Sequence, residues 1–167
     1  MRNKLIVAAV VLVGLASVAY AAYSQVLNVN GTGTASGSWA VKITGITLVS
    51  STGVTENAVP SFTDTSATFD DNLAYPGATA QYDVTVTNSG TIPAILSSLT
   101  DLTTINSAAP AYITYATSGL TAGTTTIAAN GGTNVLHVTV TWDSTSSPTT
   151  TGTSKAATIA LNYDQNP

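Results

Sequence analysis

The sequence of 167 residues contains no cysteine and very few basic side chains. Without cysteine the chain cannot form a disulfide, so its stability must come from packing, from assembly or from another kind of crosslink. Only four residues are Lys or Arg, and two of these, Arg2 and Lys4, lie at the extreme N-terminus. Nucleic-acid binding needs clustered Lys and Arg to displace counterions from phosphates. The sequence therefore argues against nucleic acid, and equally against anionic lipid, as a partner.

The residues that usually perform catalysis or bind metals are also scarce. His137 is the only histidine, and there is no H-E-x-x-H, G-x-S-x-G or Walker motif. Closed zinc sites use three or four Cys or His ligands, which this chain cannot supply. The sequence predicts no enzyme, no catalytic residue, no metal and no cofactor.

Calcium is the one metal for which oxygen ligands lie close together in the sequence. Asp64, Asp70, Asp71 and Asn72 could supply carboxylate and amide oxygens. Their spacing does not match the D-x-D-x-D-G loop, and a solvated turn is the simpler interpretation.

The first 21 residues have the pattern of a signal peptide. Arg2 and Lys4 precede the apolar run 5–18, and Ala19-Tyr20-Ala21 fits the small-x-small pattern that signal peptidase cleaves. The run is shorter than the roughly 20 residues of a membrane-spanning helix. Cleavage after Ala21 would release an extracellular chain with no membrane segment. A retained anchor, or a type IV pilin helix cut near Lys4, is the alternative.

What the chain does contain is threonine, 31 residues of it, in segments that alternate between polar and apolar side chains. Period-2 alternation indicates strands with one wet face, and threonine suits such a face. We therefore predict an all-β domain over residues 39–167, an antiparallel β-sandwich of the jelly-roll or Ig-like kind. The strongest candidate strands are 39–48, 82–87, 136–143 and 158–163, and weaker ones lie near 61–69, 92–99, 111–116 and 124–128.

Residues 22–38 begin directly after the expected cleavage site and have a strand followed by a glycine-rich tether. Tyr23, Gln25, Leu27 and Val29 share one face of this strand, and Val26 lies on the other. The strand either folds back onto its own sheet or completes the sheet of a neighbouring subunit. Donation repeated head to tail would generate a fibre, because the contact is heterologous and open.

One longer stretch carries a resemblance. The leader is followed by YSQVLNVNGTGTASGSW and VKITGI, and then by L-x-x-P-G-x-x-x-x-Y-x-V-x-V-x-N-x-G-T, from Leu73 through Thr91. This order over residues 1–100 resembles the TasA/camelysin-like secreted fibre proteins and the archaeal bundling pilins similar to them. The resemblance implies a jelly-roll-like subunit that polymerises with itself by donor-strand complementation, as a cell-surface filament or biofilm-matrix fibre.

A monomeric module that binds a surface glycan or a matrix protein is the alternative function. Such a module would need exposed aromatic rings; the alternation places Trp39 and Trp142 inward, which leaves Tyr112 and Tyr115 as the best candidates. The weakly charged threonine face of a fibre subunit would instead favour lateral bundling.

Two modifications are also suggested. Asn30 begins the only N-x-[ST] glycosylation sequon. Lys42 and Lys155 are the candidate donors for an isopeptide bond, although both fall on the polar side of the alternation and are more simply interpreted as exposed charges.

Overall fold

The computed structural model describes residues 29–146 and 153–166. The chain divides into two units, Met1–Ala35 and Ser36–Pro167. Residues 29–35 of the first unit form no helix or strand, and the side chain of Val29 is exposed. The expected leader with Ala19 and Ala21, and the donor-strand residues Tyr23, Gln25, Val26 and Leu27, lie outside the described residues.

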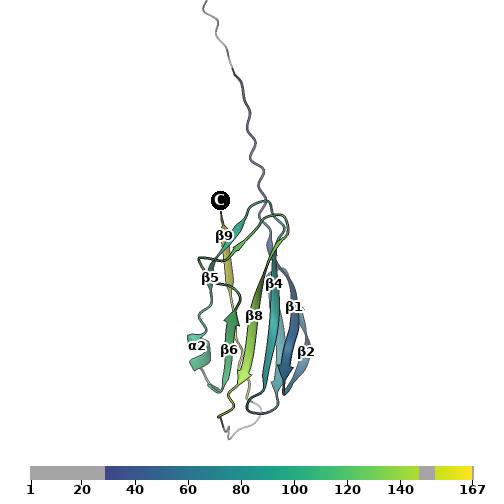
Figure 1. Cartoon of the computed structure of the whole chain (residues 1–167), viewed down its shortest axis with the longest axis vertical. Helices are drawn as coiled ribbons and strands as arrows, with labels where there is room; N and C mark the ends of the chain where they lie inside the picture. The colour runs from purple at the N-terminus through teal and green to yellow at the C-terminus, as the bar shows by residue number, and fades with distance from the viewer. Residues whose placement is uncertain (1–28, 147–152, 167) are drawn as a thin grey trace, which may run out of the picture. The chain divides into compact units, whose positions relative to one another are not determined.

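The second unit is all-β and antiparallel (Figure 1). Its sheets have the strand orders β1-β4-β8-β6, β2-β3 and β7-β5-β9. One short helix, α2 (Thr103–Ser107), lies between β5 and β6 among the described residues. The strands are β1 (Val41–Thr52), β2 (Val54–Phe62), β3 (Ala67–Leu73), β4 (Thr79–Asn88), β5 (Ala94–Leu99), β6 (Ile113–Ser118), β7 (Thr126–Ile127), β8 (Gly132–Trp142) and β9 (Leu161–Gln165).

The four-stranded sheet has one buried face and one threonine-rich face. Burial alternates residue by residue along β4, with Tyr82, Val84 and Val86 buried and the residues between them partly exposed. β8 repeats the pattern in register, because Val84 pairs with Leu136 and Tyr82 with Val138. This alternation is the direct result of period-2 side-chain direction in a strand.

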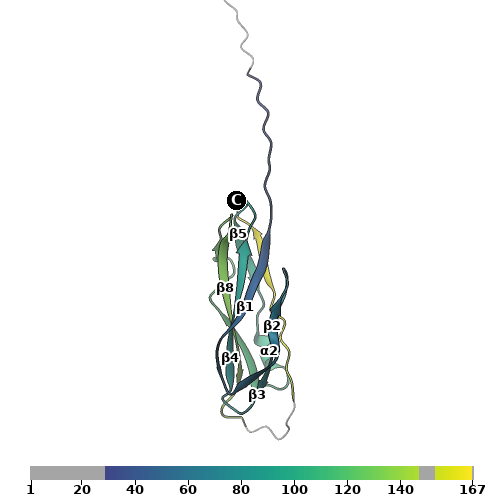
Figure 2. The same ribbon diagram turned by 90° about the vertical axis from the view of Figure 1, so that its right-hand side faces the viewer.

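The two smaller sheets contribute side chains to the same core. Phe69 of β3 stacks on Tyr82 with ring centroids 4.4 Å apart. At the other end of the sheet, Leu161 and Tyr163 of β9 pack against a cluster that contains Val86 and Ile127. Figure 2 shows β2 and β3 beside the four-stranded sheet, with the last segment of the chain running along the same side.

The sequence patterns located most of the strands. The four strong alternating segments correspond to β1, β4, β8 and β9, although unpaired chain precedes β9. The prediction of a strand near 61–69 is wrong, because Thr63–Ser66 forms a turn between β2 and β3 in which the Thr63 amide donates to the Ser66 carbonyl. The short helix α2 was not predicted.

Trp39 is the residue whose direction the alternation predicted wrongly. It precedes β1 and is 42% exposed. Farther along β1 the register with β4 shifts between Ile43 and Gly45, so that Ile46 and Leu48 lie opposite Val84 and Tyr82 on the buried face of the sheet. Ile46 is buried there, whereas Leu48 is 37% exposed.

Asn88, at the end of β4, is the only fully buried polar residue in the described part of the chain. Its amide nitrogen donates to the Ile92 carbonyl (2.8 Å), and its side-chain oxygen accepts from the Gly90 amide (3.1 Å). We expect Asn88→Ala to lower the free energy of unfolding by about 2 kcal/mol, because two hydrogen bonds worth roughly 1 kcal/mol each are lost. Urea unfolding measures the change. Ser89→Ala, at an exposed neighbouring position, is the control, and an equal loss there would contradict the assignment.

Candidate functional site

Two strand edges on the same side of the core have no partner strand among the described residues. β3 pairs with β2 along one edge, and β9 pairs with β5 along one edge. The other edge of each strand lies along a hollow in the surface, which both strands line. Unpaired N–H and C=O groups along such edges are a template for a further strand.

The hollow between these edges is a groove with two parts. One part has a volume of about 490 Å³ and the other of about 830 Å³. Both parts are lined by Ala67, Phe69 and Ala157, so the parts adjoin. We call the whole hollow the strand groove. Its walls are β3 on one side and residues 153–163 on the other.

The floor of the strand groove is the buried face of the four-stranded sheet. The smaller part has an apolar floor, and the larger part ends at the rings of Tyr112, Tyr115 and Trp142. The ring of Tyr112 stacks on Trp142, with centroids 5.5 Å apart. The apolar residues of the first floor are Ile43, Ile46, Val84, Val86, Leu136 and Val138.

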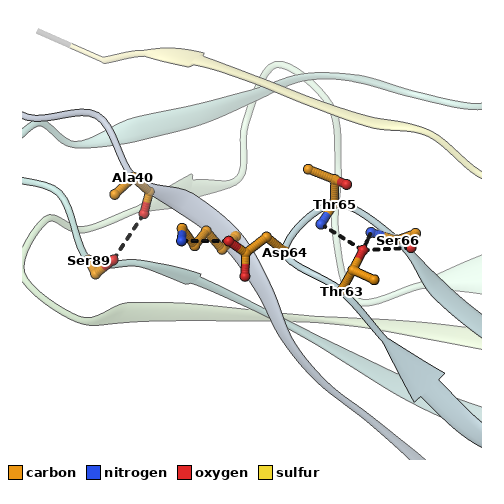
Figure 3. A network of polar contacts seen from close by, with 7 residues as sticks. Ala40, Thr63, Asp64, Thr65, Ser66 and Ser89 are labelled. Carbon is orange, nitrogen blue, oxygen red and sulfur yellow. Dashed lines mark hydrogen bonds and ion pairs between the residues drawn. The ribbon is translucent and has the colours of Figure 1, made fainter.

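The β3 wall is fixed to β1 at the turn that precedes it. The Ile43 amide donates to the Asp64 carbonyl (2.9 Å), and Lys42 Nζ lies 2.6 Å from Asp64 Oδ2. Figure 3 shows Asp64 next to the Thr63–Ser66 turn, where the Thr63 hydroxyl accepts from the Ser66 amide (3.1 Å). Both ends of the ion pair are largely exposed, so the pair contributes at most about 1 kcal/mol.

The opposite wall is an extended segment without a ladder. Residues 155, 157, 159, 161 and 163 are half-buried and the residues between them are exposed, as in a single strand, but only β9 is paired. Lys155 belongs to the inward set, so the prediction that it lies on the polar side is wrong. Burial lowers the pKa of its ammonium group.

Carboxylates lie at the larger part of the groove. The buried hydroxyl of Tyr82 donates to Asp71 Oδ1 (2.6 Å) and lies 3.3 Å from Glu56 Oε1. Asp71 Oδ2 is buried and has no hydrogen-bond partner. Burial raises the pKa of Asp71, and the neighbouring charges of Glu56 and Asp70 act in the same direction, while the Tyr82 hydrogen bond opposes the shift. The pKa of Tyr82 is raised as well, first by burial and then by the hydrogen bond that its hydroxyl donates to Asp71.

The acidic residues considered for calcium do not converge. Asp64 pairs with Lys42, Asp70 is exposed and accepts from Asn57, and Asp71 contacts Tyr82. No group of three His, Cys, Asp or Glu side chains in the described residues is arranged to hold a metal.

The other predicted sites fall in several places. Asn30 is exposed in a stretch with no helix or strand. His137 contacts Asp83 on the threonine face of the sheet. Tyr112 and Tyr115 are not exposed, contrary to expectation: Tyr115 is buried, and Tyr112 stacks on Trp142.

Sequence reasoning missed the strand groove and the inward direction of Lys155. The alternation of Ala157, Ile159 and Leu161 was visible, but the pairing of a strand depends on contacts distant in sequence. The position of Lys155 in the same alternation was the available signal, because a lysine that points inward needs acceptors for its ammonium group.

No protein-family model matches the chain, and no curated protein or solved structure is significantly similar to it. Within residues 29–146 and 153–166, no helix is long and apolar enough to cross a membrane.

The raised pKa of Asp71 predicts a pH-dependent stability. The folded state holds the Asp71 proton more tightly than the unfolded state, whose pKa is near 3.8. Stability therefore falls as the pH rises from about 3.8 through the raised pKa. We expect Asp71→Asn to raise the Tm at pH 7 by a few degrees, since asparagine still accepts from Tyr82 without the buried charge.

Calorimetry between pH 3 and pH 7 tests this effect. The difference in Tm between Asp71→Asn and the wild type should close at the acidic end of that range. Asp70→Asn, on the exposed face of the same strand, should have a smaller effect. A difference that is constant across the pH range would show that charge burial is not its cause.

Proposed function

We propose that this protein is a structural subunit of an extracellular filament, in which residues 22–30 of one subunit fill the strand groove of the next. The observation that carries the proposal is the pair of facing, unpaired edges at β3 and residues 153–163 above an apolar floor. A strand inserted there would gain hydrogen bonds on both sides. This is the donor-strand arrangement that the sequence resemblance implied.

The composition of the donor segment fits the two parts of the groove. Tyr23, Leu27 and Val29 share one face, and alternate apolar side chains of an added strand fill pockets in the floor. Gln25 lies on the same face and could hydrogen-bond polar groups of the larger part, where Asp71 Oδ2 has no partner. The donor residues therefore match the apolar part and the polar part of the groove.

On this proposal the domain is a jelly-roll-like β-sandwich that lacks one strand. The four-stranded sheet would be one layer. The second layer would consist of β2-β3 and β9-β5-β7, joined into one sheet by the donor strand. The proposal thereby accounts for two small sheets on a single core face.

The tether starts at one end of the domain, which supports head-to-tail assembly. Before β1 begins, Ser38 exchanges hydrogen bonds with Thr91, so the chain leaves the domain beside the β4–β5 turn. The groove extends from that end to Trp142 at the other end of β8. A strand leaving one subunit can therefore enter the far end of another, and the contact repeats without closing.

The donor segment provides the first test. We expect the double variant Leu27→Asp and Val29→Asp in the mature chain, residues 22–167, to abolish filaments while leaving the Tm of the soluble domain unchanged. Burying two carboxylates against an apolar floor is unfavourable by more free energy than the edge hydrogen bonds of the strand contribute. Electron microscopy and sedimentation measure the polymer.

Val26→Asp is the matched control, because Val26 lies on the opposite face of the donor strand and should tolerate the charge. Filaments formed by the double variant at the wild-type yield would rule out the donor strand. Removal of residues 22–30 should have the same effect as the double variant.

Lateral bundling provides a second test. The outer face of β4 and β8 presents Thr85, Thr87, Thr139 and Thr141, with few charges to repel a neighbouring filament. We expect Thr85→Asp with Thr139→Asp to disperse bundles into single filaments at low salt and to allow bundles again at high salt. Electron micrographs across a salt series measure this; bundles that persist at low salt would place the lateral contact elsewhere.

A further inference from the structure

We propose that Lys155 is a positioning residue for assembly, which holds residues 153–160 in place as the strand edge on which the donor strand of a neighbour pairs. The inference rests on the proposed function, since it assigns one wall of the strand groove to the incoming strand.

The surroundings of Lys155 are those of an anchor. Its Nζ lies within hydrogen-bond distance of four backbone carbonyl oxygens: those of Asn106 (2.9 Å), Ala108 (3.0 Å), Pro110 (3.3 Å) and Ile113 (2.8 Å). These carbonyls belong to the end of α2, the loop that follows it and the first residue of β6. A single ammonium group therefore joins the groove wall to the neighbouring loop, and it satisfies carbonyls that the end of a helix leaves unpaired.

A second contact holds the same point of the wall. The Tyr115 hydroxyl donates to the Lys155 carbonyl (2.6 Å). Tyr115 is in turn fixed by Asn106, whose side chain accepts from the Tyr115 amide (2.8 Å) and donates to its carbonyl (2.9 Å). Lys155 is thus held through its side chain and its backbone at once.

The wall has no ladder of its own to hold it. No backbone–backbone hydrogen bond involves residues 153–159 within the described residues, and the first such bond is from Thr100 to the Ala160 carbonyl. The segment nevertheless has the alternating burial of a strand, with Ala157 and Ile159 half-buried. A segment that is extended, fixed by side chains and unpaired along its backbone is a template for a new strand.

The physical role of such an anchor is preorganisation. Ordering the backbone of one residue costs roughly 1–2 kcal/mol of conformational entropy. If the wall were disordered before binding, this cost would reduce the free energy gained when each donor strand binds. The other wall has less need of its lysine, because the Ile43–Asp64 backbone hydrogen bond holds it beside the exposed Lys42–Asp64 pair. We therefore expect replacement of Lys155 to slow assembly and replacement of Lys42 to leave it nearly unchanged.

Seeded growth of filaments by the mature chain, residues 22–167, tests the proposal. Sheared wild-type filaments serve as seeds, and soluble subunits of each variant are added while growth is followed by light scattering. Lys155→Met should slow subunit addition by about tenfold or more, the change that 1.4 kcal/mol of lost preorganisation produces. Tyr115→Phe keeps the ring and loses one hydrogen bond, so it should slow addition by about threefold.

Two controls separate positioning from simple loss of stability. Lys42→Met removes the same charge from the opposite wall, and Ser107→Ala removes the hydrogen bond from the Ser107 hydroxyl to the Thr104 carbonyl (3.0 Å) at the end of α2, a bond that involves neither Lys155 nor Tyr115. Both should add to seeds within about twofold of the wild-type rate after urea unfolding has established the stability of each variant. If Lys155→Met fails to fold, Tyr115→Phe alone decides.

The outcomes are distinguishable. If the wild-type chain forms filaments and Lys155→Met or Tyr115→Phe subunits add to seeds at the wild-type rate, the proposed role of Lys155 is wrong. The proposed function would be unaffected by that result. Equal slowing by Ser107→Ala would overturn it as well, because the stability of α2 and its loop would then explain the effect. A wild-type chain that never forms filaments would instead refute the proposed function on which the inference rests.

Discussion

The backbone of an extended chain needs hydrogen-bond partners on both sides, and this requirement is not fully met at two places in the domain. β3 has one side without a partner strand in the described residues, and residues 153–159 have no partner strand on either side. Apolar side chains of the four-stranded sheet lie between these two segments. Edges of this kind are usually shortened, charged or covered, because they recruit other chains. Here the edges are long and the floor between them is apolar, so the domain is suited to receive a strand.

A surface that must recruit one particular strand also has to keep its shape while empty. On the proposed function, the domain achieves this largely with side chains, because a backbone ladder would occupy the groups that the donor strand needs. Lys155 and Tyr115 hold one wall by its side chain and a single carbonyl, and the β2–β3 turn is bound to β1 at Asp64. The packing of Phe69 on Tyr82 keeps β3 over the core without using the unpaired edge of that strand.

The sequence was sufficient for the fold class and for most strands, because alternation is a local property that one sheet face imposes directly. The turns at Gly53, Gly77 and Asn130-Gly131 were visible for a similar reason, since each has a positive φ that favours Gly or Asn. Trp39 was placed wrongly, because the start of β1 is set by its pairing with β4.

The site was less accessible to such reasoning than the fold. The donor residues could be proposed from their position after the leader, but a groove is defined by strands distant in sequence. Lys155 illustrates the limit. It was predicted on the polar side, although it shares the inward alternation of Ala157 and Ile159. Its four carbonyl acceptors lie 42 to 49 residues earlier, in α2, the following loop and the start of β6, and follow only from the tertiary structure.

The position of Ser38 has a consequence for the choice between self and neighbour. Residues 155–163 run from the Trp142 end of the groove toward the end where the tether leaves. A strand from a subunit stacked beyond the Trp142 end would run antiparallel to that wall, whereas the chain's own strand, entering beside Ser38, would run parallel to it. β3 runs the opposite way, from the tether end to the Trp142 end, so either strand would be antiparallel to one wall and parallel to the other. Donation and self-closure therefore give opposite pairings on the same wall, and nuclear Overhauser effects between the inserted strand and residues 155–163 distinguish them.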